Sequence, residues 1–337
     1  MRPPAAAGRV WKRIEHRMIA MIGGGSWATA IVKILLEDKS RRLNWWVRSE
    51  EVRDGLAATS HNPHHLTSVA LDAKRLHVSS DLAEVVAASD ILVLAVPSVY
   101  LAETLALLPS DAYRGKRFVS AIKGFVPQQR QSVSKFLEAT LPVGADSISV
   151  VSGPSHAEEV AEGKATFLTV ASHNRQLADE VASLLCCKYI HTSVSDEVDS
   201  LELCGLAKNV YAVAAGLAAG LGYGDNLVAV LTTAAAHELQ SLLPETSLAF
   251  RLLGDLIVTC FSRHSRNRAL GEAVAHRQRP ADHFRNTGMV AEGYYSAAVM
   301  HHMSTPCTTP IAEAVYSILY EDADPRKSID YLIDNVL

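Results

Sequence analysis

The 337-residue sequence has little of several features that mark specialised classes of protein. It has no excess of basic charge, because 32 Lys and Arg against 36 Asp and Glu give a formal net charge of −4. The total charge therefore excludes a general electrostatic attraction to nucleic acid or to an anionic membrane. No apolar run approaches the roughly 20 residues of a membrane-spanning helix, since Lys, Asn, Asp or Gly interrupts each one. We expect no stable membrane insertion and no nucleic-acid partner, and any anionic ligand must be held by a local cluster of cations.

Cysteine is also scarce, with five residues that show neither a disulfide framework nor zinc-finger spacing: Cys186, Cys187, Cys204, Cys260 and Cys307. An odd, irregular set favours reduced thiols in a cytoplasmic protein. The histidines gather at 61–65 and 301–302, with no cysteine or carboxylate at metal-ligand spacing beside them. We expect surface histidines and no metal.

The first seventeen residues, "MRPPAAAGRVWKRIEHR", are basic and precede Met18. They lack the apolar core of a secretory signal. We expect residues 1–17 to be an extension without order, either of a bacterial kind or the result of a start codon placed too early.

From Met18 to about residue 195, short apolar runs alternate with helical patterns. The runs that predict strands are "MIAMIG", "RLNWWVR", "DILVLAVP", "RFVSAIKG", "SISVVSGP" and "ATFLTVAS". Helices are predicted at "SWATAIVKILLED" and around "HAEEVAEG". Apolar strands that alternate with helices are typical of a parallel, doubly wound sheet. Residues 18–195 are therefore expected to form a Rossmann-like α/β domain that binds a dinucleotide.

After Asp196 the strand patterns stop and only helical patterns follow. They predict helices at Val198–Ala219, Asn226–Leu243, Arg266–Arg277, Ala291–Met303 and Ile311–Glu321. This change in pattern places a boundary near residue 195. We expect residues 196–337 to form an all-α domain that docks tightly on the first.

A glycine-rich turn follows the first predicted strand. In "IAMIGGGSWATAIV", Gly23, Gly25 and Ala28 have G-x-G-x-x-A spacing and open a helix. Gly23 permits a tight turn, Gly25 lets the backbone approach a pyrophosphate, and a small third residue permits close packing. The free N–H groups of the helix then bind phosphate. At the end of the second strand Arg48 stands where an acidic residue would bind the ribose of NAD, which favours NADP(H) over NAD(H).

Five further segments carry polar groups in unusual places. Lys208 lies in the apolar stretch "LCGLAKNVYAVAAGLAAG", where it either extends its head into water or serves a buried function. "AIKGF" places Lys123 after a strand, and "VVSGPSHAEEV" places Ser155 where it caps a helix. "LLGDLIVTC" holds Asp255 between leucines, and "SRHSRNRALG" gathers arginines at a helix start. Taken singly, each segment is compatible with a structural role.

Taken together and in order, these segments resemble the bacterial NAD(P)+-dependent glycerol-3-phosphate dehydrogenase family. The resemblance covers over nine-tenths of the chain and is most specific where "KNVYAVAAG" joins "GLGYGDN"; the other matching segments are "GGGSWATA", "AVPS", "AIKG", "SGPSHAEEVAEG", "GDLIVTC", "SRNRALG", "VAEGYYSA" and "PIAEAVYSILYE". The chain departs from the family at the third position of the glycine motif, where Ala28 replaces a glycine. The segment between Asp225-Asn226 and Gly254-Asp255 is also several residues shorter than is common. It has "LPETSLAFRLLGDL" in place of the usual glycine-rich approach, which leaves the local geometry before Asp255 open.

The resemblance implies reversible hydride transfer between a nicotinamide and C2 of sn-glycerol 3-phosphate, formed by reduction of dihydroxyacetone phosphate. It implies a cytoplasmic enzyme, a homodimer, that supplies the glycerophospholipid backbone. Lys208 is then the general acid/base, since reduction of a ketone requires a proton donor at the oxygen. The implied substrate contacts are Lys123, Gly153, Ser155, Lys208, Asp255, Ser265, Arg266 and Asn267. The implied cofactor contacts, besides the Gly23–Gly25 turn, are Ser26, Trp27, Arg48, Lys123, Ala157, Arg266, Val290 and Glu292.

Two other functions remain open from the sequence. One is a related two-domain dehydrogenase that acts on a hydroxy acid, which would have no obvious use for "SRNR". The other is a cofactor-binding sensor without chemistry, which the presence of both Lys208 and Asp255 disfavours.

Overall fold

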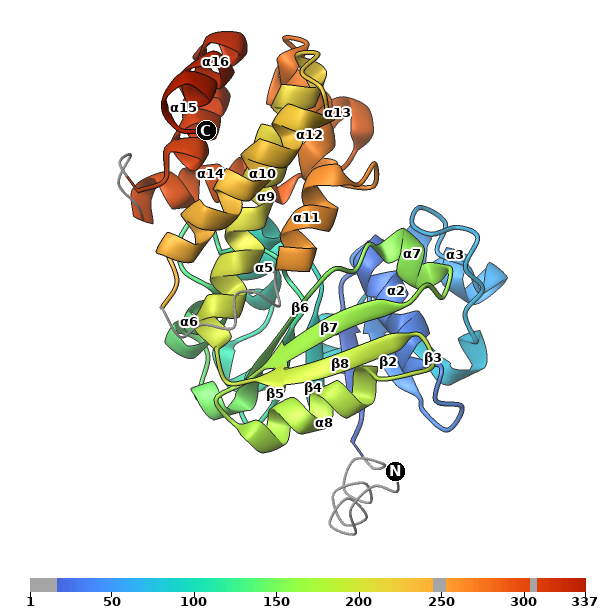
Figure 1. Cartoon of the computed structure of the whole chain (residues 1–337). Helices are drawn as coiled ribbons and strands as arrows, with labels where there is room; N and C mark the ends of the chain where they lie inside the picture. The colour runs from blue at the N-terminus through green and yellow to red at the C-terminus, as the bar shows by residue number, and fades with distance from the viewer. Residues whose placement is uncertain (1–16, 245–252, 304–307) are drawn as a thin grey trace.

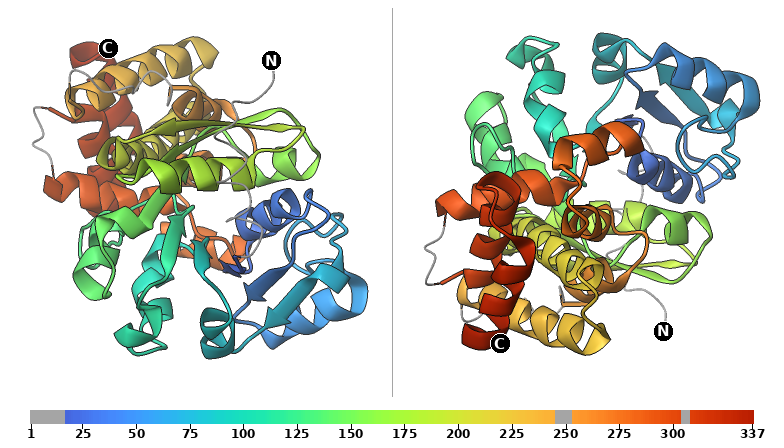
Figure 2. Two further views of the ribbon diagram at one scale, coloured as in Figure 1. Left: turned by 90° about the horizontal axis from the view of Figure 1, so that it is seen from below. Right: turned by 90° about the horizontal axis from the view of Figure 1, so that it is seen from above.

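The structure is a computed structural model, and it describes residues 17–244, 253–303 and 308–337. A sheet with its covering helices forms one part of the molecule, and a group of helices forms the other (Figure 1). In both views of Figure 2 the N-terminal strands and helices lie on the opposite side of the molecule from the last C-terminal helices. The expected basic extension, residues 1–17, lies outside the described residues except for Arg17.

One eight-stranded sheet organises the first part. Its strands are β1 (Ile19–Ile22), β2 (Leu43–Trp46), β3 (Leu76–Ser79), β4 (Ile91–Leu94), β5 (Arg117–Ser120), β6 (Ile148–Ser152), β7 (Thr166–Ala171) and β8 (Ile190–Ser195). Their order across the sheet is β3-β2-β1-β4-β5-β6-β7-β8. The central strands β1 and β4 are buried along their whole length. The expected Rossmann-like sheet is confirmed, and the reversal of strand order between β1 and β4 creates the crevice where such sheets bind ligands.

The expected parallel pairing is wrong at one place, because β6 and β7 pair antiparallel. The connection between them contains only the short helix α7 (Ala157–Ala161). Five helical residues span about 8 Å, whereas a crossover must return along a strand of about 17 Å. The chain therefore turns back beside β6, and β8 then pairs parallel with β7 through a longer helix, α8 (Arg175–Leu185).

The sequence patterns missed two strands, β3 and β8, which lie at the two edges of the sheet. Both are mixed in polarity, with sequences LHVS and IHTSVS, and neither is buried along its length. Edge strands need no continuous apolar run, because water covers one side of them. The patterns also missed α8 and four other crossover helices, α3 (Glu50–Thr59), α4 (Leu82–Ala87), α5 (Ser98–Leu105) and α6 (Val133–Thr140), whereas the predicted helix after β1 is present as α2 (Ser26–Leu35).

The part after β8 is helical throughout its described residues. Five helices match the predicted ones within a few residues: α9 (Val198–Gly220), α10 (Asp225–Ser241), α12 (Arg266–Ala275), α14 (Glu292–Met303) and α15 (Pro310–Tyr320). Three were not predicted: α11 (Leu253–Phe261), α13 (Pro280–Thr287) and α16 (Pro325–Asn335). Residues 245–252, which form the part of the shortened segment just before α11, lie outside the described residues.

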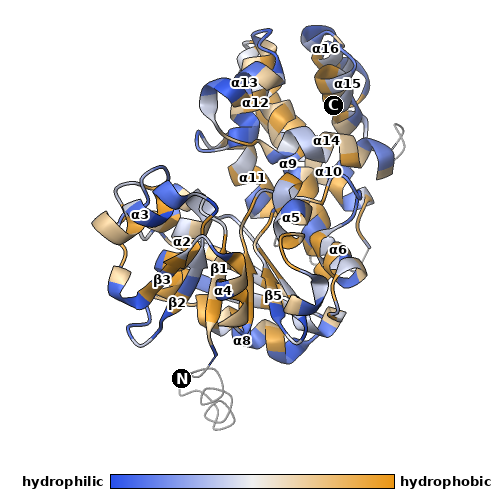
Figure 3. Ribbon diagram, turned by 180° about the vertical axis from the view of Figure 1, so that it is seen from behind, coloured by the Kyte–Doolittle hydropathy of each residue, from blue (hydrophilic) through white to orange (hydrophobic). Residues whose placement is uncertain are grey.

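Helix α9 is the central element of this part, and α10, α11, α12, α14 and α15 all pack on it. Small residues let α12 approach α9 closely. A Cβ on Gly216 would lie 2.0 Å from the carbonyl oxygen of Arg268, and one on Gly271 would lie 2.2 Å from that of Val213. The two helices therefore touch backbone to backbone. Figure 3 shows apolar colours concentrated in the interior strands and polar colours on outer elements such as α3.

The expectation that no apolar stretch is long enough to cross a membrane is wrong for α9. By length and composition Val198–Gly220 passes such a test, with a mean hydropathy of 1.3. In the structure 83% of the 18-residue apolar window within this helix is buried inside the protein. Its apolar surface is therefore explained by helix packing, and it is the core helix of the second part.

Candidate functional site

A cleft lies where the carboxyl ends of the central strands meet the helical part. The loops after β1, β4, β5 and β6 line one side, and α9, α11, α12 and the start of α14 line the other. Thirteen residues expected at the site line this cleft: Gly25, Ser26, Trp27, Lys123, Ser155, Ala157, Lys208, Asp255, Ser265, Arg266, Asn267, Val290 and Glu292. The sequence thus brings to one place residues that are up to 267 positions apart, from Gly25 to Glu292.

The glycine turn after β1 has the geometry that a dinucleotide needs. Gly23 has a φ of +127°, and a Cβ there would lie 2.6 Å from the carbonyl oxygen of Ala95. Gly25 has open space where a Cβ would be, and it precedes α2 without a side-chain cap. The N–H groups at the start of α2 are thus free for an anion. The turn thus offers the backbone shape and the N–H donors that the pyrophosphate of a nicotinamide dinucleotide requires.

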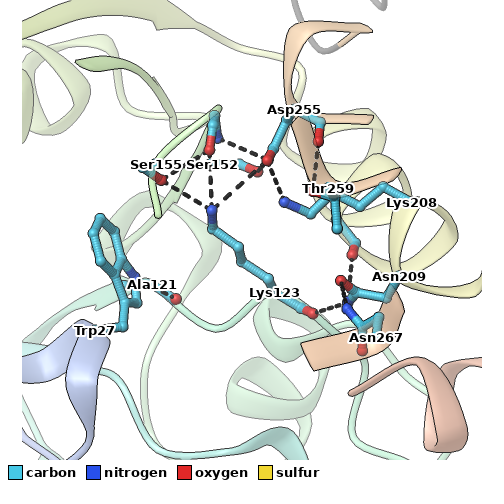
Figure 4. A network of polar contacts seen from close by, with 12 residues as sticks. Trp27, Ala121, Lys123, Ser152, Ser155, Lys208, Asn209, Asp255, Thr259 and Asn267 are labelled. Carbon is cyan, nitrogen blue, oxygen red and sulfur yellow. Dashed lines mark hydrogen bonds and ion pairs between the residues drawn. The ribbon is translucent and has the colours of Figure 1, made fainter. Parts of the chain in front are cut away.

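The centre of the cleft is a buried carboxylate between two lysines (Figure 4). Asp255, on α11, forms an ion pair with Lys208 of α9 through Oδ1, and its Oδ2 lies 3.8 Å from Nζ of Lys123. Lys208 is 4% exposed and Asp255 is 3% exposed. Lys208 therefore does not extend into water, so the first of its two sequence interpretations is wrong. Its charge is balanced by Asp255 inside the protein.

The second lysine is held from the sheet side. Nζ of Lys123 donates to the carbonyl oxygen of Gly153 at 3.0 Å and to Oγ of Ser155 at 2.9 Å. It also lies 5.4 Å from the ring centre of Trp27. Gly153 donates its N–H to Oδ2 of Asp255 at 3.2 Å. Gly153 does not line the cleft itself, but its backbone joins the lysine and the carboxylate.

Burial and the neighbouring charges shift the pKa values of this group. Burial lowers the pKa of Lys123 to about 7, an effect that Asp255 opposes and that the positive charge of Lys208 adds to. Burial alone would raise the pKa of Asp255, but the two lysines and the hydrogen bonds to its carboxylate hold it below its ordinary value. At neutral pH the site therefore contains an ionised Asp255 beside a Lys123 that gains or loses its proton easily.

Sequence reasoning missed a polar network behind Lys123 and Lys208. Asn209 donates from Nδ2 to the carbonyl oxygen of Lys123 at 2.5 Å and accepts from Asn267 at 2.8 Å. Asn267 in turn accepts the N–H of Gly293 at 2.8 Å. Ser152 donates to Asp255 at 3.3 Å. The only sequence signal for Asn209 was a second polar residue beside Lys208 in an apolar helix.

The arginine segment lies at the start of α12, with Ser265 as its N-cap. Oγ of Ser265 accepts the N–H of Arg268 at 3.2 Å. The guanidinium of Arg266 reaches across the cleft and donates to Oγ of Ser26, the first residue of α2, at 3.2 Å. Arg266 therefore joins the start of α12 to the start of α2 across the cleft.

Of two further residues expected to contact the cofactor, Glu292 lies in the cleft and Arg48 lies outside it. Glu292 accepts hydrogen bonds from the N–H and the hydroxyl of Ser98, at 2.8 and 2.6 Å. Burial raises its pKa, and both Ser98 hydrogen bonds and Arg266 oppose that rise. Arg48 is exposed and does not line the cleft. Its guanidinium lies 5.6 Å from the ring centre of Tyr100.

The described residues contain no group of three or more His, Cys, Asp or Glu that could hold a metal ion. The expected histidine groups have other partners. His65 lies 3.3 Å from Oγ of Ser26, and His301 pairs with Glu313 at 2.8 Å. Four cysteines lie in the described residues, and none of them forms a disulfide. Cys204 and Cys260 are buried, Cys187 is half-buried and Cys186 is exposed.

Comparison with known proteins gives two family matches. The family described as "NAD-dependent glycerol-3-phosphate dehydrogenase N-terminus" matches residues 18–178, and its C-terminal counterpart matches residues 197–330. A glycerol-3-phosphate dehydrogenase [NAD(P)+] from Salinibacter ruber is 35% identical over 94% of both chains. One from Chlorobium phaeobacteroides is 33% identical over 92% of this chain and 96% of its own. The crystal structure of glycerol-3-phosphate dehydrogenase from Coxiella burnetii superposes with a TM-score of 0.86 at 26% identity, covering 95% of this chain and all of that one.

Proposed function

The chain belongs to the NAD-dependent glycerol-3-phosphate dehydrogenase family, and on that premise we propose that it reduces dihydroxyacetone phosphate to sn-glycerol 3-phosphate. It is an NAD(P)-dependent oxidoreductase. The observation that supports the proposed reaction best is the convergence of Lys208, Asp255, Lys123 and Arg266 on one cleft beside the glycine turn.

We propose that the cofactor enters along the glycine turn after β1. Gly23 and Gly25 shape the turn, and Ser26, Trp27, Lys123, Ala157, Arg266, Val290 and Glu292 surround the remainder of the cofactor. When bound, the reduced nicotinamide supplies a hydride to C2 of the substrate. Arg48 follows β2 at the position that faces the ribose in this fold, and its positive charge favours the 2′-phosphate of NADP(H).

The coenzyme preference has a direct test. Arg48→Asp replaces a group that attracts the 2′-phosphate by one that repels it, so NADPH binding should weaken more than NADH binding. Fluorescence titration of both coenzymes against the parent and the variant measures this. Equal weakening of both would place Arg48 away from the 2′ position.

The substrate phosphate carries close to two negative charges and needs cations and N–H donors. Arg266 offers two parallel donors at the start of α12, and Lys123 adds a third cationic donor. The other proposed substrate contacts are Gly153, Ser155, Ser265 and Asn267, which lie around the same cations. Dihydroxyacetone phosphate would thus lie with its phosphate toward α12 and its carbonyl toward Lys208.

Lys208 is the proposed general acid. Its ammonium is buried and directed at Asp255, so it is desolvated and held in one orientation. As the carbonyl of the substrate accepts a hydride, its oxygen gains negative charge, which Nζ of Lys208 stabilises and then protonates. Asp255 orients the ammonium and balances its charge. In the reverse direction the neutral amine accepts the proton from the C2 hydroxyl.

We further propose that residues 18–195 and 196–337 form a dinucleotide-binding and a substrate-binding domain. The enzyme would act as a homodimer in the cytoplasm and supply the glycerophospholipid backbone. The mildly acidic composition and the irregular cysteines support a cytoplasmic protein.

The proposed reaction is tested by oxidation of NADPH, followed by its absorbance, with dihydroxyacetone phosphate and with a panel of 2-keto acids. We expect turnover with the phosphorylated ketone only. Turnover with a 2-keto acid but not with dihydroxyacetone phosphate would support the hydroxy-acid dehydrogenase instead. NADPH binding without any turnover would support the sensor.

A further inference from the structure

A pair of histidines lies at the cleft, and the proposed reaction gives a role to neither ring. His156 directly precedes α7, His264 lies between α11 and α12, and both line the cleft. Their ring centres are 5.9 Å apart, and the ring planes are tilted by 52°. His264 is exposed, whereas His156 is half-buried. One ring of the pair therefore meets water, and the other lies deeper in the protein.

His156 has a ring nitrogen that the fold does not use. Its Nε2 is buried and has no hydrogen-bond partner among the described residues. The ring does not cap α7 either, although His156 is the residue just before that helix. A buried nitrogen without a partner costs free energy, so its presence points to a role beyond the stability of the fold.

His156 adjoins the two lysines that share Asp255. The hydroxyl of Ser155, the preceding residue, accepts a hydrogen bond from Nζ of Lys123 at 2.9 Å. Burial lowers the pKa of His156 below its ordinary value of 6.5, and the positive charges of Lys123 and Lys208 lower it further. Beyond the effect of burial, Lys208 also lowers the pKa of Lys123, both by its charge and by a hydrogen bond. The imidazole and the two ammonium groups thus interact with one another.

The groups around His156 leave it neutral at pH 7. The carboxylate of Glu158, on α7, and the backbone of Val258, on α11, favour its charged form, but burial and the lysines outweigh them. His264 faces its ring from the loop before α12. A neutral imidazole has a hydrogen on one nitrogen and a lone pair on the other. It can therefore accept a proton on one side and release one from the other.

We propose that His264 and His156 form a proton relay between water and the lysines that share Asp255. The proposal rests on the proposed function, in which Lys208 protonates the substrate. Lys208 is 4% exposed, and a bound substrate and cofactor would cover it further, so it cannot easily take a proton from water directly. A relay that begins at an exposed ring and ends beside the lysines removes this obstacle.

The relay balances the protons of the reaction. Each reduction consumes one proton, because Lys208 gives its own to the C2 oxygen and becomes a neutral amine. His264 takes a proton from water and passes it to one ring nitrogen of His156, and one water molecule can bridge the 5.9 Å between the ring centres. His156 releases the proton of its other nitrogen to the lysines, and Lys208 regains its charge. Oxidation of the alcohol runs the same transfers in reverse.

The test compares His156→Gln, His264→Gln and the double variant in the steady-state reduction of dihydroxyacetone phosphate by NADPH. Glutamine remains polar but does not exchange a proton at neutral pH. In dilute buffer we expect kcat to fall about tenfold, less than the hundredfold or more of a missing general acid, because water still delivers protons slowly. KM for both substrates should change less than about twofold. The double variant should be no slower than the slower single variant, because both changes interrupt one path.

Two readouts separate a relay from a purely structural role. Imidazole added at constant pH and ionic strength is a small proton carrier, so it should restore most of the lost kcat in the variants and leave the parent unchanged. The solvent deuterium isotope effect on kcat should be larger in the variants than in the parent, since proton delivery then limits turnover. Damage to the fold would produce neither effect.

His301 and His302 provide the matched control. They form a second histidine pair, on α14, with ring centres 5.2 Å apart, and they lie outside the cleft. His301 is half-buried like His156, and His302 is exposed like His264. His301→Gln and His302→Gln should therefore leave kcat and its response to imidazole as they are in the parent. A loss of kcat in these controls that imidazole restores would overturn the relay.

Three other outcomes would overturn it as well. Unchanged kcat in either His156→Gln or His264→Gln would do so, since the relay needs both rings. A rise in KM without rescue by imidazole would show that His156 contacts a substrate directly. Independent losses that multiply in the double variant would show that the rings do not share one path. Failure of the proposed function is distinct, because the parent protein would then turn over no dihydroxyacetone phosphate. His264→Gln, at an exposed position, keeps the test valid if His156→Gln does not fold.

Discussion

At the residue level, the two lysines that share Asp255 are assigned different roles because their surroundings differ. Lys208 is almost fully enclosed by the helical part and has the carboxylate as its ion-pair partner. Lys123 has a side chain that is 20% exposed and donates to Gly153 and Ser155 at the edge of the sheet. The enclosed lysine suits proton transfer, and the more exposed one suits the binding of a charged substrate.

Lys208→Ala tests the first assignment. The variant lacks the proton donor, so turnover should fall about a hundredfold or more, as is typical when a general acid is removed. NADPH binding should change little, because the glycine turn is untouched. Single-turnover kinetics with dihydroxyacetone phosphate give the rate of the chemical step. Near-normal turnover would move the role to Lys123.

Lys123 should make substrate binding depend on pH. Its pKa, lowered by burial to about 7 from an ordinary value of 10.5, leaves it mostly neutral at pH 8 in the free protein. A phosphate dianion beside it favours the ammonium, so binding at pH 8 should take up close to one proton. Calorimetry in two buffers with different ionisation enthalpies measures this uptake. Lys123→Met should abolish it, and a parent protein that takes up no proton would contradict the assignment.

Arg266→Lys tests whether Arg266 binds the phosphate of the substrate. The change keeps the charge and loses the two parallel donors, so it is not conservative at this position. We expect a loss of about 1.5–3 kcal/mol in kcat/KM with dihydroxyacetone phosphate, the range for hydrogen bonds to charged groups. Unphosphorylated dihydroxyacetone, a very poor substrate, should be affected far less. Equal losses with both substrates would mean that Arg266 serves the cofactor or the fold.

At the level of elements, the close contact of α9 and α12 depends on glycines that leave no room for a side chain. Gly271→Ala would place a Cβ against backbone atoms of Val213, which cannot move aside as a flexible side chain can. Overpacking of this kind costs about 1–3 kcal/mol. Urea unfolding should report a loss of that size.

Gly144→Ala is the matched control for that change. Gly144 has a φ of −99° and open space around the position of a Cβ. The same substitution there should alter the free energy of unfolding by less than about 1 kcal/mol. If both variants lost the same stability, the helix contact would not be the cause.

The strands and helices also show which elements a sequence pattern can predict. Buried strands such as β1 and β4 and the long helix α9 have strong apolar patterns, because burial on all sides demands them. Strands β3 and β8 contain histidine, serine and threonine, since they lie at the edges. The antiparallel pairing of β7 depends on the length of the connection through α7, which a pattern of single strands does not contain.

At the scale of the whole molecule, the motifs predicted which residues line the cleft. They did not predict the hydrogen bonds and ion pairs among those residues. The ion pair of Lys208 with Asp255 needs α9 and α11 to be adjacent, and α11 itself was not predicted. Asn209 and Ser98 became visible only when the two parts were brought together. Each contributes a hydrogen bond across the cleft, and no local pattern encodes such a bond.

The burial of α9 has a consequence for how the protein is made. The helices α12 and α14 that cover it begin at Arg266 and Glu292, well after α9 ends at Gly220. At about 5–20 residues per second of synthesis, α9 remains without these partners for a time on the order of seconds. During that interval the growing chain displays a segment with the length and apolarity of a membrane anchor. We therefore expect the segment to be prone to aggregation until α12 and α14 have been synthesised, and we expect a chain cut short after Gly220 to aggregate.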